Sequence, residues 1–249
     1  MEDLPYIDFV RDEGAALAPA AQRDMKEHVP SCPEWNVFQL VEHTGYVHRN
    51  ISERLRRKTI ERDPPLEVEE APTDEAGLID WYERGLKTLE QLLRELPVDS
   101  PAWTWWPPDN TAGFWRRRMA QETAVHRLDA ENATGTAAAI DPELAADGVD
   151  EFLDIHMVAG AEEEDSWAGT EGTVHFHSTD APGEWILRLT KGELPKARRG
   201  HERGEAAVRA NASDLLLFIW RRKQPSDFEI LGDEALVTSL WEYFGPVGI

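Results

Sequence analysis

The chain has 249 residues, 41% of them hydrophobic, and a formal charge of -22 from 26 Lys and Arg against 48 Asp and Glu. So acidic a surface repels DNA and RNA, whose binding proteins use basic side chains to displace phosphate counterions. The longest apolar run, Leu215 to Trp220, is far shorter than the roughly 20 residues that span a bilayer. We therefore expect a soluble protein of one large or two ordinary domains, with no nucleic-acid or membrane partner.

The N-terminus and the lone cysteine indicate a cytoplasmic protein. The first residues, MEDLPYIDFV, are acidic where a signal peptide needs a basic region. Cys32 permits no internal disulfide, which suits a reducing compartment. Because it lies beside two prolines with no histidine in an obvious pairing context, we interpret Cys32 as structural rather than nucleophilic.

The first 140 residues have the pattern of helices joined by proline-rich connections. Asn36 with Gln39 forms a capping box at the start of the second helix, and Gly135 is suited to follow the end of the fourth. The expected helices cover residues 4–28 with a kink near Pro19, 36–57, 75–96 and 111–135. Four long helices in this arrangement predict a four-helix bundle.

After residue 140 the pattern changes to that of a smaller mixed domain. Short alternating segments bounded by turn residues are typical of strands, and "SDLLLFIW" reads as a buried helix capped by Ser213. The expected elements are a helix over 141–160, strands over 172–180, 183–190, 206–210 and 228–231, and a final helix over 234–244. The fold class is therefore α+β overall, with a bundle over 1–140 and an α+β domain over 141–249.

The fourth helix carries ionisable groups on the side that should be apolar. Trp115 and Met119 mark the buried face, and Glu122, His126 and Asp129 follow at the same alternating spacing of four and three residues. Burying three such groups without partners would cost several kcal/mol each. They therefore need either protein partners or a ligand.

Two interpretations of this polar face stay open. In the structural one, Glu122 pairs with Arg118 and His126 bonds to a helix neighbour. In the functional one, Glu122 and His126 hold a divalent metal ion from adjacent turns of one helix. A third ligand would then come from another helix. Periodicity favours His48, in the middle of the second helix's apolar stripe, over His43 on its flank, and His28 is a weaker candidate.

Two further histidines lie in the second domain. His175 and His177 are two residues apart in an expected strand, so they share a face. No carboxylate is evident beside them in the sequence. We interpret them as ordinary strand residues.

Two stretches of the bundle together resemble a known family. "VPSCPEWNVFQLVEHTGYVHRN" and, further on, "WRRRMAQETAVHRLDAENATG" resemble the mycothiol-dependent maleylpyruvate isomerases of actinobacteria, within the wider DinB-like four-helix metalloenzymes. That family has a sterol-carrier-like α+β domain after the bundle, and "VRANASDLLLFIWRRK" resembles the signature of this domain. The resemblance covers most of the chain.

The resemblance implies a zinc site formed by His43, Glu122 and His126. His43 is the histidine of the "LVEH" tetrad, and this overrides the periodicity preference for His48, which would then lie behind the ligands. Asp129 would support a ligand histidine, or instead form an ion pair with an arginine; both remain open. Nitrogen and oxygen ligands also admit nickel, manganese or iron.

The resemblance also implies a chemistry. Three protein ligands leave metal positions open, and in the family the thiol of the cofactor mycothiol takes one of them. A divalent ion favours the thiolate over the thiol. The thiolate would add to an activated double bond of a small-molecule substrate, the resulting single bond would rotate, and expulsion of the thiolate would give the trans isomer. If the thiolate instead stays bonded to the electrophile it attacks, the reaction is S-transfer.

The substrate is the point at which the sequence departs from the family. Family members carry an arginine in the segment entering the third helix, whereas this chain has the acidic "EVEEAPTDEAGL". Arg84 and Arg118 flank the inward seam and are our candidates for binding the substrate. Trp103, Trp105 and Trp106 would line a pocket mouth or form a packed lid.

Two other functions remain possible from sequence alone. One is a hydrolase that uses zinc-bound water and needs no thiol. The other is a non-catalytic module that binds a lipid-like ligand in its α+β domain and holds a structural metal in the bundle.

Overall fold

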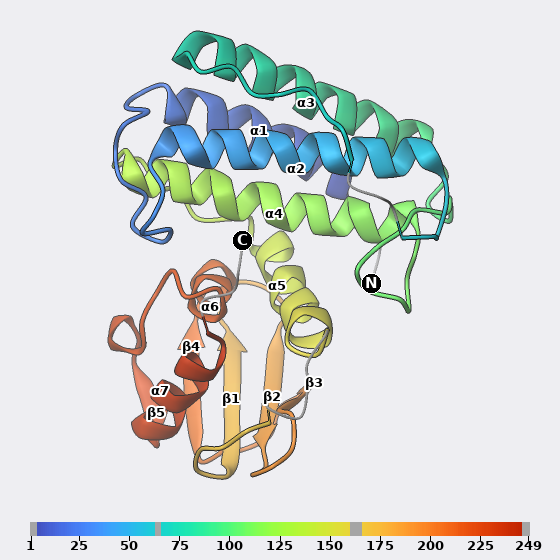
Figure 1. Cartoon of the computed structure of the whole chain (residues 1–249). Coiled ribbons are helices and arrows are strands. Elements are labelled where there is room, and N and C mark those ends of the chain that lie inside the picture. Colours follow the sequence, from blue (N-terminus) through green and yellow to red (C-terminus); the bar gives the residue numbers. More distant parts are fainter. Residues whose placement is uncertain (1–3, 63–65, 160–165, 246–249) are drawn as a thin grey trace. The chain divides into compact units, whose positions relative to one another are not determined.

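The computed structural model describes residues 4–62, 66–159 and 166–245. The chain divides into two compact units, Met1–Ile140 and Asp141–Ile249. A helical unit precedes a unit containing a sheet, which confirms the predicted α+β class (Figure 1). Among the described residues, no helix combines the length and the apolar character that crossing a membrane requires.

Four long helices lie side by side in the first unit. Helix α1 packs against α3 and α4, and α2 packs against the same two helices. Their buried faces meet in a core that includes Leu17, Leu40, Trp81, Leu89 and Met119. The bounds are Tyr6–Ala21 for α1, Val37–Arg57 for α2, Glu75–Glu95 for α3 and Ala112–Ala133 for α4.

The ends of α2 and α4 follow the sequence signals. Gln39 N donates to Asn36 Oδ1 and Asn36 N donates to Gln39 Oε1, each at 3.0 Å, so the predicted capping box is present. Gly135 follows α4 with a φ of 74°, the left-handed conformation that glycine adopts without strain.

The first helix is shorter than predicted. Helix α1 ends at Ala21 instead of residue 28, although Pro19 is accommodated inside it. The following segment folds back on itself: Val29 N donates to Trp35 O, and an antiparallel bridge joins His28 to Asn36. The chain therefore needs a compact loop here to bring Asn36 to the start of α2.

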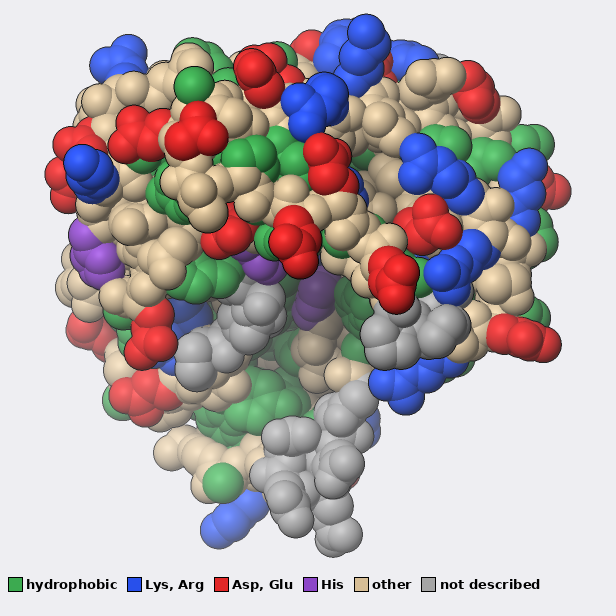
Figure 2. All heavy atoms as spheres, turned by 45° about the horizontal axis from the view of Figure 1, so that its top comes forward, with side chains coloured by type: hydrophobic (Ala, Val, Ile, Leu, Met, Phe, Trp, Pro, Cys, Tyr) green, Lys and Arg blue, Asp and Glu red, His purple; other side chains and the backbone are tan. Residues whose placement is uncertain are grey.

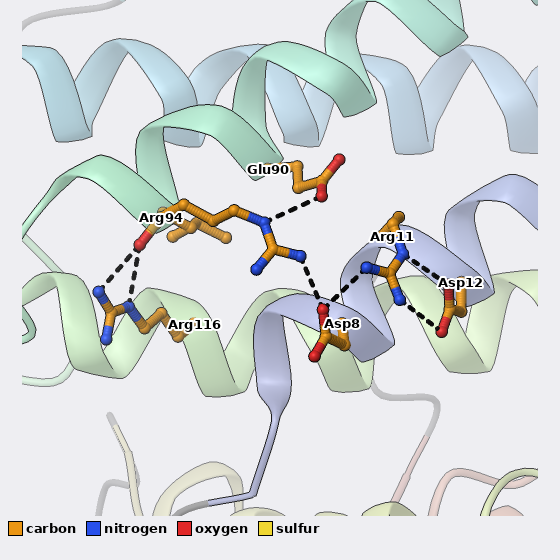
Figure 3. Close-up of polar contacts among 7 residues, drawn as sticks. Asp8, Arg11, Asp12, Glu90, Arg94 and Arg116 are labelled. Atoms are coloured by element: carbon orange, nitrogen blue, oxygen red, sulfur yellow. Dashed lines mark hydrogen bonds and ion pairs between the residues drawn. The ribbon is translucent and has the colours of Figure 1, made fainter.

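Arginines tie neighbouring helices of the bundle together at the surface (Figure 3). Arg94 of α3 donates to Asp8 of α1 at 2.7 Å and to Glu90 at 3.1 Å, while Arg11 donates to the same Asp8 oxygen at 2.9 Å. The hydrogen bond from Arg94 holds the pKa of Asp8 below its ordinary value. Arg116 of α4 donates to backbone carbonyls at the end of α3, which have no partner within that helix.

The second unit is a five-stranded sheet with helices. The sheet has the order β3-β2-β1-β4-β5, in which only the β1–β4 pairing is parallel. The strands are β1 (Gly172–Ser178), β2 (Glu184–Leu189), β3 (Lys196–Arg199), β4 (Ala206–Ala210) and β5 (Ile230–Gly232). The helices are α5 (Pro142–Glu151), which continues into the π-helix η1 (Phe152–His156), α6 (Ala212–Ile219), the 3-10 turn η3 (Pro225–Asp227) and α7 (Glu234–Tyr243).

One face of this sheet forms the core of the unit. Val174, Phe176, Leu187 and Val208 are fully buried, and the Phe176 ring packs edge-to-face on Phe218 of α6 at 5.6 Å. Residues of β1 that alternate with these, among them His175 and His177, point to the opposite face.

The helix predicted over 141–160 is formed by α5 and η1 and ends at His156; residue 160 lies outside the described residues. Two further details of the second unit differ from the sequence predictions. The edge strand β3, with the sequence KARR, was not predicted, because three basic residues in four hide the usual apolar alternation. The N-cap of α6 is Asn211 rather than Ser213: Asp214 N donates to the Asn211 side chain at 2.7 Å. Ser213 is instead buried inside the helix.

The acidic residues are not gathered into a single patch on the face drawn in Figure 2. Acidic and basic side chains are interspersed there.

Candidate functional site

The structure brings His43 of α2 together with Glu122 and His126 of α4. Glu122 Oε1 lies 3.5 Å from His43 Nε2 and 3.3 Å from His126 Nε2. One nitrogen or oxygen from each of the three residues lies within 4.8 Å of the other two. We call this group the bundle cluster.

Local structure explains how the bundle cluster assembles. Glu122 and His126 are one helical turn apart on α4, so their side chains lie on the same side. The ring of His43 meets that of His126 edge-on, with centroids 5.2 Å apart, and lies against Trp35 at 4.8 Å. The loop before α2 therefore helps to hold the histidine in place.

Further side chains orient the bundle cluster. Arg118 Nη2 donates to Glu122 Oε2 at 2.9 Å, so the other carboxylate oxygen faces the two histidines. Asp129 Oδ2 lies 3.1 Å from His126 Nδ1, and Ser31 Oγ donates to Asp129 Oδ1 at 2.6 Å. When His126 Nδ1 carries the proton that Asp129 accepts, the lone pair of Nε2 faces Glu122 and His43.

These contacts shift the pKa values of the buried groups. Burial raises the pKa of Glu122, but the neighbouring His126, His43 and Arg118 outweigh it and hold the pKa well below its ordinary value. For His126, burial lowers the pKa, and the carboxylates of Asp129 and Glu122 outweigh burial and raise it. Glu122 is therefore an anion at neutral pH.

The bundle cluster fits a divalent metal ion. His43 Nε2 is buried and makes no hydrogen bond within the described part of the chain, although it faces Glu122. Two imidazoles and a carboxylate are suitable ligands for Zn²⁺ and similar ions, and three such ligands leave a position for another molecule.

His48, which periodicity favoured, is not part of this cluster. It is fully buried, and its Nε2 lies 3.1 Å from Thr123 Oγ1. Burial lowers its pKa to about 3, so the imidazole is neutral. The bundle cluster lies at the margin of the core, where the side chains of His43 and Glu122 are 21% and 19% exposed, and a residue on the flank of the apolar stripe reaches it.

The two candidate arginines occupy different places. Arg118 touches the bundle cluster through Glu122. Arg84 is 58% exposed and pairs with Glu69 at 3.1 Å. It borders a cavity of about 340 Å³ whose lining residues, which also include Arg49 and Glu67, contain no member of the bundle cluster.

The tryptophan-rich loop packs against the helices. Trp115 of α4 donates to the backbone carbonyl of Trp103 at 3.0 Å, and Arg54 lies over the Trp103 ring. The Trp105 ring meets Phe114 edge-to-face at 5.3 Å. All three loop tryptophans remain partly exposed, so the pocket and lid interpretations both stay predictions.

A second cluster in the sheet unit was missed by the sequence analysis. The statement that no carboxylate accompanies His175 and His177 is wrong: Glu184 lies within 3.2 Å of both, and His201 joins them. The pairing of β1 with β2 sets His177 opposite Glu184. Only that register, together with the position of the connection after β3, reveals the group.

Comparisons with known proteins agree with this architecture. Residues 8–131 match the sequence model of the mycothiol maleylpyruvate isomerase N-terminal domain, and residues 143–238 match that of the C-terminal domain of the same family. Comparison with curated protein sequences gives no significant match.

Two crystal structures share the fold at low sequence identity. One is a point mutant of the mycothiol-dependent maleylpyruvate isomerase, with a TM-score of 0.59 and 13% identity, covering 90% of this chain and 91% of that chain. The other is the mycothiol-dependent maleylpyruvate isomerase itself, with a TM-score of 0.56, 12% identity, and 88% of each chain covered.

Proposed function

The chain belongs to the mycothiol maleylpyruvate isomerase family, and from this premise we propose that it is a mycothiol-dependent cis–trans isomerase whose metal ion is held by His43, Glu122 and His126. Membership confirms the resemblance seen in the two bundle stretches and the prediction that the chain is an enzyme. The choice of zinc, the cytoplasmic location, and the predicted DinB-like and sterol-carrier-like roles of the domains remain part of the proposal.

The observation that carries the proposal is the buried His43 Nε2. This nitrogen lies across from Glu122 and His126 without a hydrogen bond of its own among the described residues. Leaving a buried polar atom unsatisfied costs about 1–3 kcal/mol. A metal ion between the three residues would remove that cost by bonding to Nε2.

The metal and mycothiol would together supply a nucleophilic sulfur that adds reversibly to a double bond, allowing rotation before it leaves. The chain's own residues prepare the site for this. Asp129 accepts the Nδ1 proton of His126 and so keeps Nε2 available as a ligand. Arg118 holds one oxygen of Glu122, which fixes the direction of the other. Ser31 in turn holds Asp129.

The substrate we propose is a small electrophilic alkene rather than maleylpyruvate specifically. The segment before α3 carries Glu67 and Glu69, and Glu69 binds both Arg49 and Arg84. Arg118 is engaged with Glu122. The two arginines predicted from sequence are thus paired with carboxylates, which disfavours a role in gripping a dicarboxylate.

The first experiment measures metal content and thiol-dependent turnover on the purified full chain. Mass spectrometry should find about one divalent ion per chain fewer in Glu122→Gln and in His126→Ala than in the wild type, while the exposed-loop variant His28→Ala keeps the wild-type content. Isomerisation of maleylpyruvate and of related cis-alkenes should require added mycothiol and should fall at least about 100-fold in both cluster variants, because a metal-free site does not activate the thiol.

The outcomes separate the alternatives. Turnover of an ester or amide without thiol would replace the isomerase with the hydrolase, and accumulation of a thiol conjugate would indicate S-transfer. If Glu122→Gln and His126→Ala keep the metal and the activity of the wild type, the proposal is wrong.

A further inference from the structure

The face of the sheet opposite its core carries a second group of metal-binding side chains. His175 and His177 of β1 point to this face, and Glu184 of β2 is the direct cross-strand partner of His177. His201, in the connection from β3 to β4, completes the group. These four residues, which we call the sheet cluster, offer ligand atoms that all lie within 4.8 Å of one another.

The carboxylate of Glu184 lies at the centre of the sheet cluster. Its Oε1 is 3.1 Å from His177 Nδ1, and its Oε2 is 3.2 Å from His175 Nε2 and 2.5 Å from His201 Nδ1. In a tetrahedral site with metal–ligand distances of about 2.0–2.1 Å, neighbouring ligand atoms are about 3.3 Å apart. The separations of His175 and His177 from the carboxylate are close to this value, whereas His201 lies at hydrogen-bonding distance from Oε2 and would move outward slightly on coordination.

A turn of the backbone at Gly200 places His201 over the strands. Gly200 has a φ of 149°, a conformation that side-chain-bearing residues rarely adopt, and its N–H donates to Glu184 O at 3.0 Å. The chain thus turns immediately after β3 and presents His201 to the carboxylate of the residue that anchors the turn. The His201 side chain is 77% exposed, so the core does not force it into this position.

The chemical composition of the sheet cluster selects the kind of ligand. Three imidazoles converge on one carboxylate, and neutral imidazole is the form that binds a metal. Imidazole-rich sites suit zinc, copper, nickel and iron, whereas magnesium and calcium prefer oxygen ligands throughout.

We propose that His175, His177, Glu184 and His201 bind one divalent transition-metal ion in the sheet unit, separately from the bundle cluster. Four protein ligands occupy the coordination positions of a closed tetrahedral site. The ion would join β1, β2 and the connection after β3, so its role is to hold this connection on the sheet. This inference does not depend on the activity proposed for the bundle cluster.

The test uses the full chain with His126→Ala, so that the bundle cluster no longer contributes. After removal of metal and dialysis against Zn²⁺, this variant should retain one ion per chain by mass spectrometry. Adding His175→Ala should remove that ion, while adding His28→Ala should not. By calorimetric titration, Zn²⁺ affinity should fall at least about 10-fold with either Glu184→Gln or His201→Ala.

Two results would overturn the proposal. The first is a His126→Ala chain that binds no Zn²⁺, or that binds it equally well after Glu184→Gln and His201→Ala. The second is displacement of Zn²⁺ by equimolar Mg²⁺ or Ca²⁺, which would mean a nonspecific acidic surface. Because His201 is exposed, its variant should fold even if His175→Ala does not, and circular dichroism checks this for each chain.

Discussion

Asp129 connects His126 of the bundle cluster to the loop before α2. It is fully buried and lies between Ser31 and His126, at 2.6 Å and 3.1 Å. A carboxylate in this position fixes both the tautomer and the direction of the imidazole. The contact with His126 is the one that the supporting role requires, and that role stays a prediction.

Replacing Asp129 should therefore weaken metal binding without removing a ligand. In Asp129→Asn, the amide keeps the shape but loses the charge that holds the His126 proton. We expect the affinity of the bundle cluster for Zn²⁺ to fall by about 10- to 100-fold, measured by competition with a chelator. Ser31→Ala is the matched control and should have a smaller effect; equal affinity in Asp129→Asn and wild type would contradict the role.

His48 illustrates the cost of burying an ionisable group in the core. Its folded-state pKa is about 3 and its ordinary value is 6.5. Between these values the unfolded chain binds a proton that the folded chain does not, so this group lowers stability as pH falls from 6.5 towards 3. At higher pH both states are neutral and the effect vanishes.

The loss of stability at acidic pH that His48 causes should be absent in His48→Gln. Between pH 7 and pH 4.5, protonation of His48 in the unfolded state should cost the wild type roughly 2–3 kcal/mol of unfolding free energy that the variant does not lose. Urea denaturation of both chains at the two pH values measures this difference. Parallel losses in the two chains would show that His48 is not the group responsible.

The element that positions His43 is α2, and its start is defined by the Asn36–Gln39 capping box. The cap leads directly into the turn that precedes the ligand, and Trp35, just before the cap, contacts the His43 ring. Stability of this end of the helix and geometry of the bundle cluster are therefore coupled.

Removing the cap should destabilise the chain in a measurable way. Asn36→Ala leaves Gln39 N without its acceptor, and we expect a loss of about 1 kcal/mol of unfolding free energy in urea. Lys58, which follows α2 at its other end, provides a matched control: Lys58→Ala has no capping bond to lose and should cost less. A stability of Asn36→Ala equal to that of the wild type would mean that the capping box contributes nothing.

At the scale of the whole molecule, the charge of -22 opposes compaction. Local ion pairs such as Arg94–Asp8 act in the other direction, but they are exposed and each contributes little. Salt screens both, and at about 0.1 M the screening length of about 10 Å is shorter than the distances over which the repulsion accumulates.

Stability should consequently rise with moderate salt. We expect the melting temperature of the metal-free chain to increase by a few degrees between about 10 mM and 200 mM NaCl as long-range repulsion is screened. Differential scanning calorimetry measures this change. A steady decrease would indicate that the surface ion pairs, not the net charge, dominate the electrostatics of folding.

Several features could be predicted because they depend on residues close together in the sequence. The helix period sets Glu122 and His126 one turn apart, and a capping box requires only Asn36 and Gln39. The apolar stripes and the strand alternation likewise gave the α+β class. In each case the hydrogen bonds or the side-chain direction follow from neighbours within a few positions.

Other features depend on how distant elements pack. Periodicity favoured His48 because it indicates which side of α2 faces the core, and His48 is buried in the core. The family resemblance pointed to His43 instead, and the packing of α2 on α4 brings this flanking residue to Glu122. The register of β1 on β2 and the turn at Gly200 decide that His175 and Glu184 meet His201. Sequence alone therefore determined most of the elements and the spacing within them, except the edge strand β3 and the end of α1. The tertiary structure decided which side chains converge, because convergence depends on the pairing between segments and not on either segment.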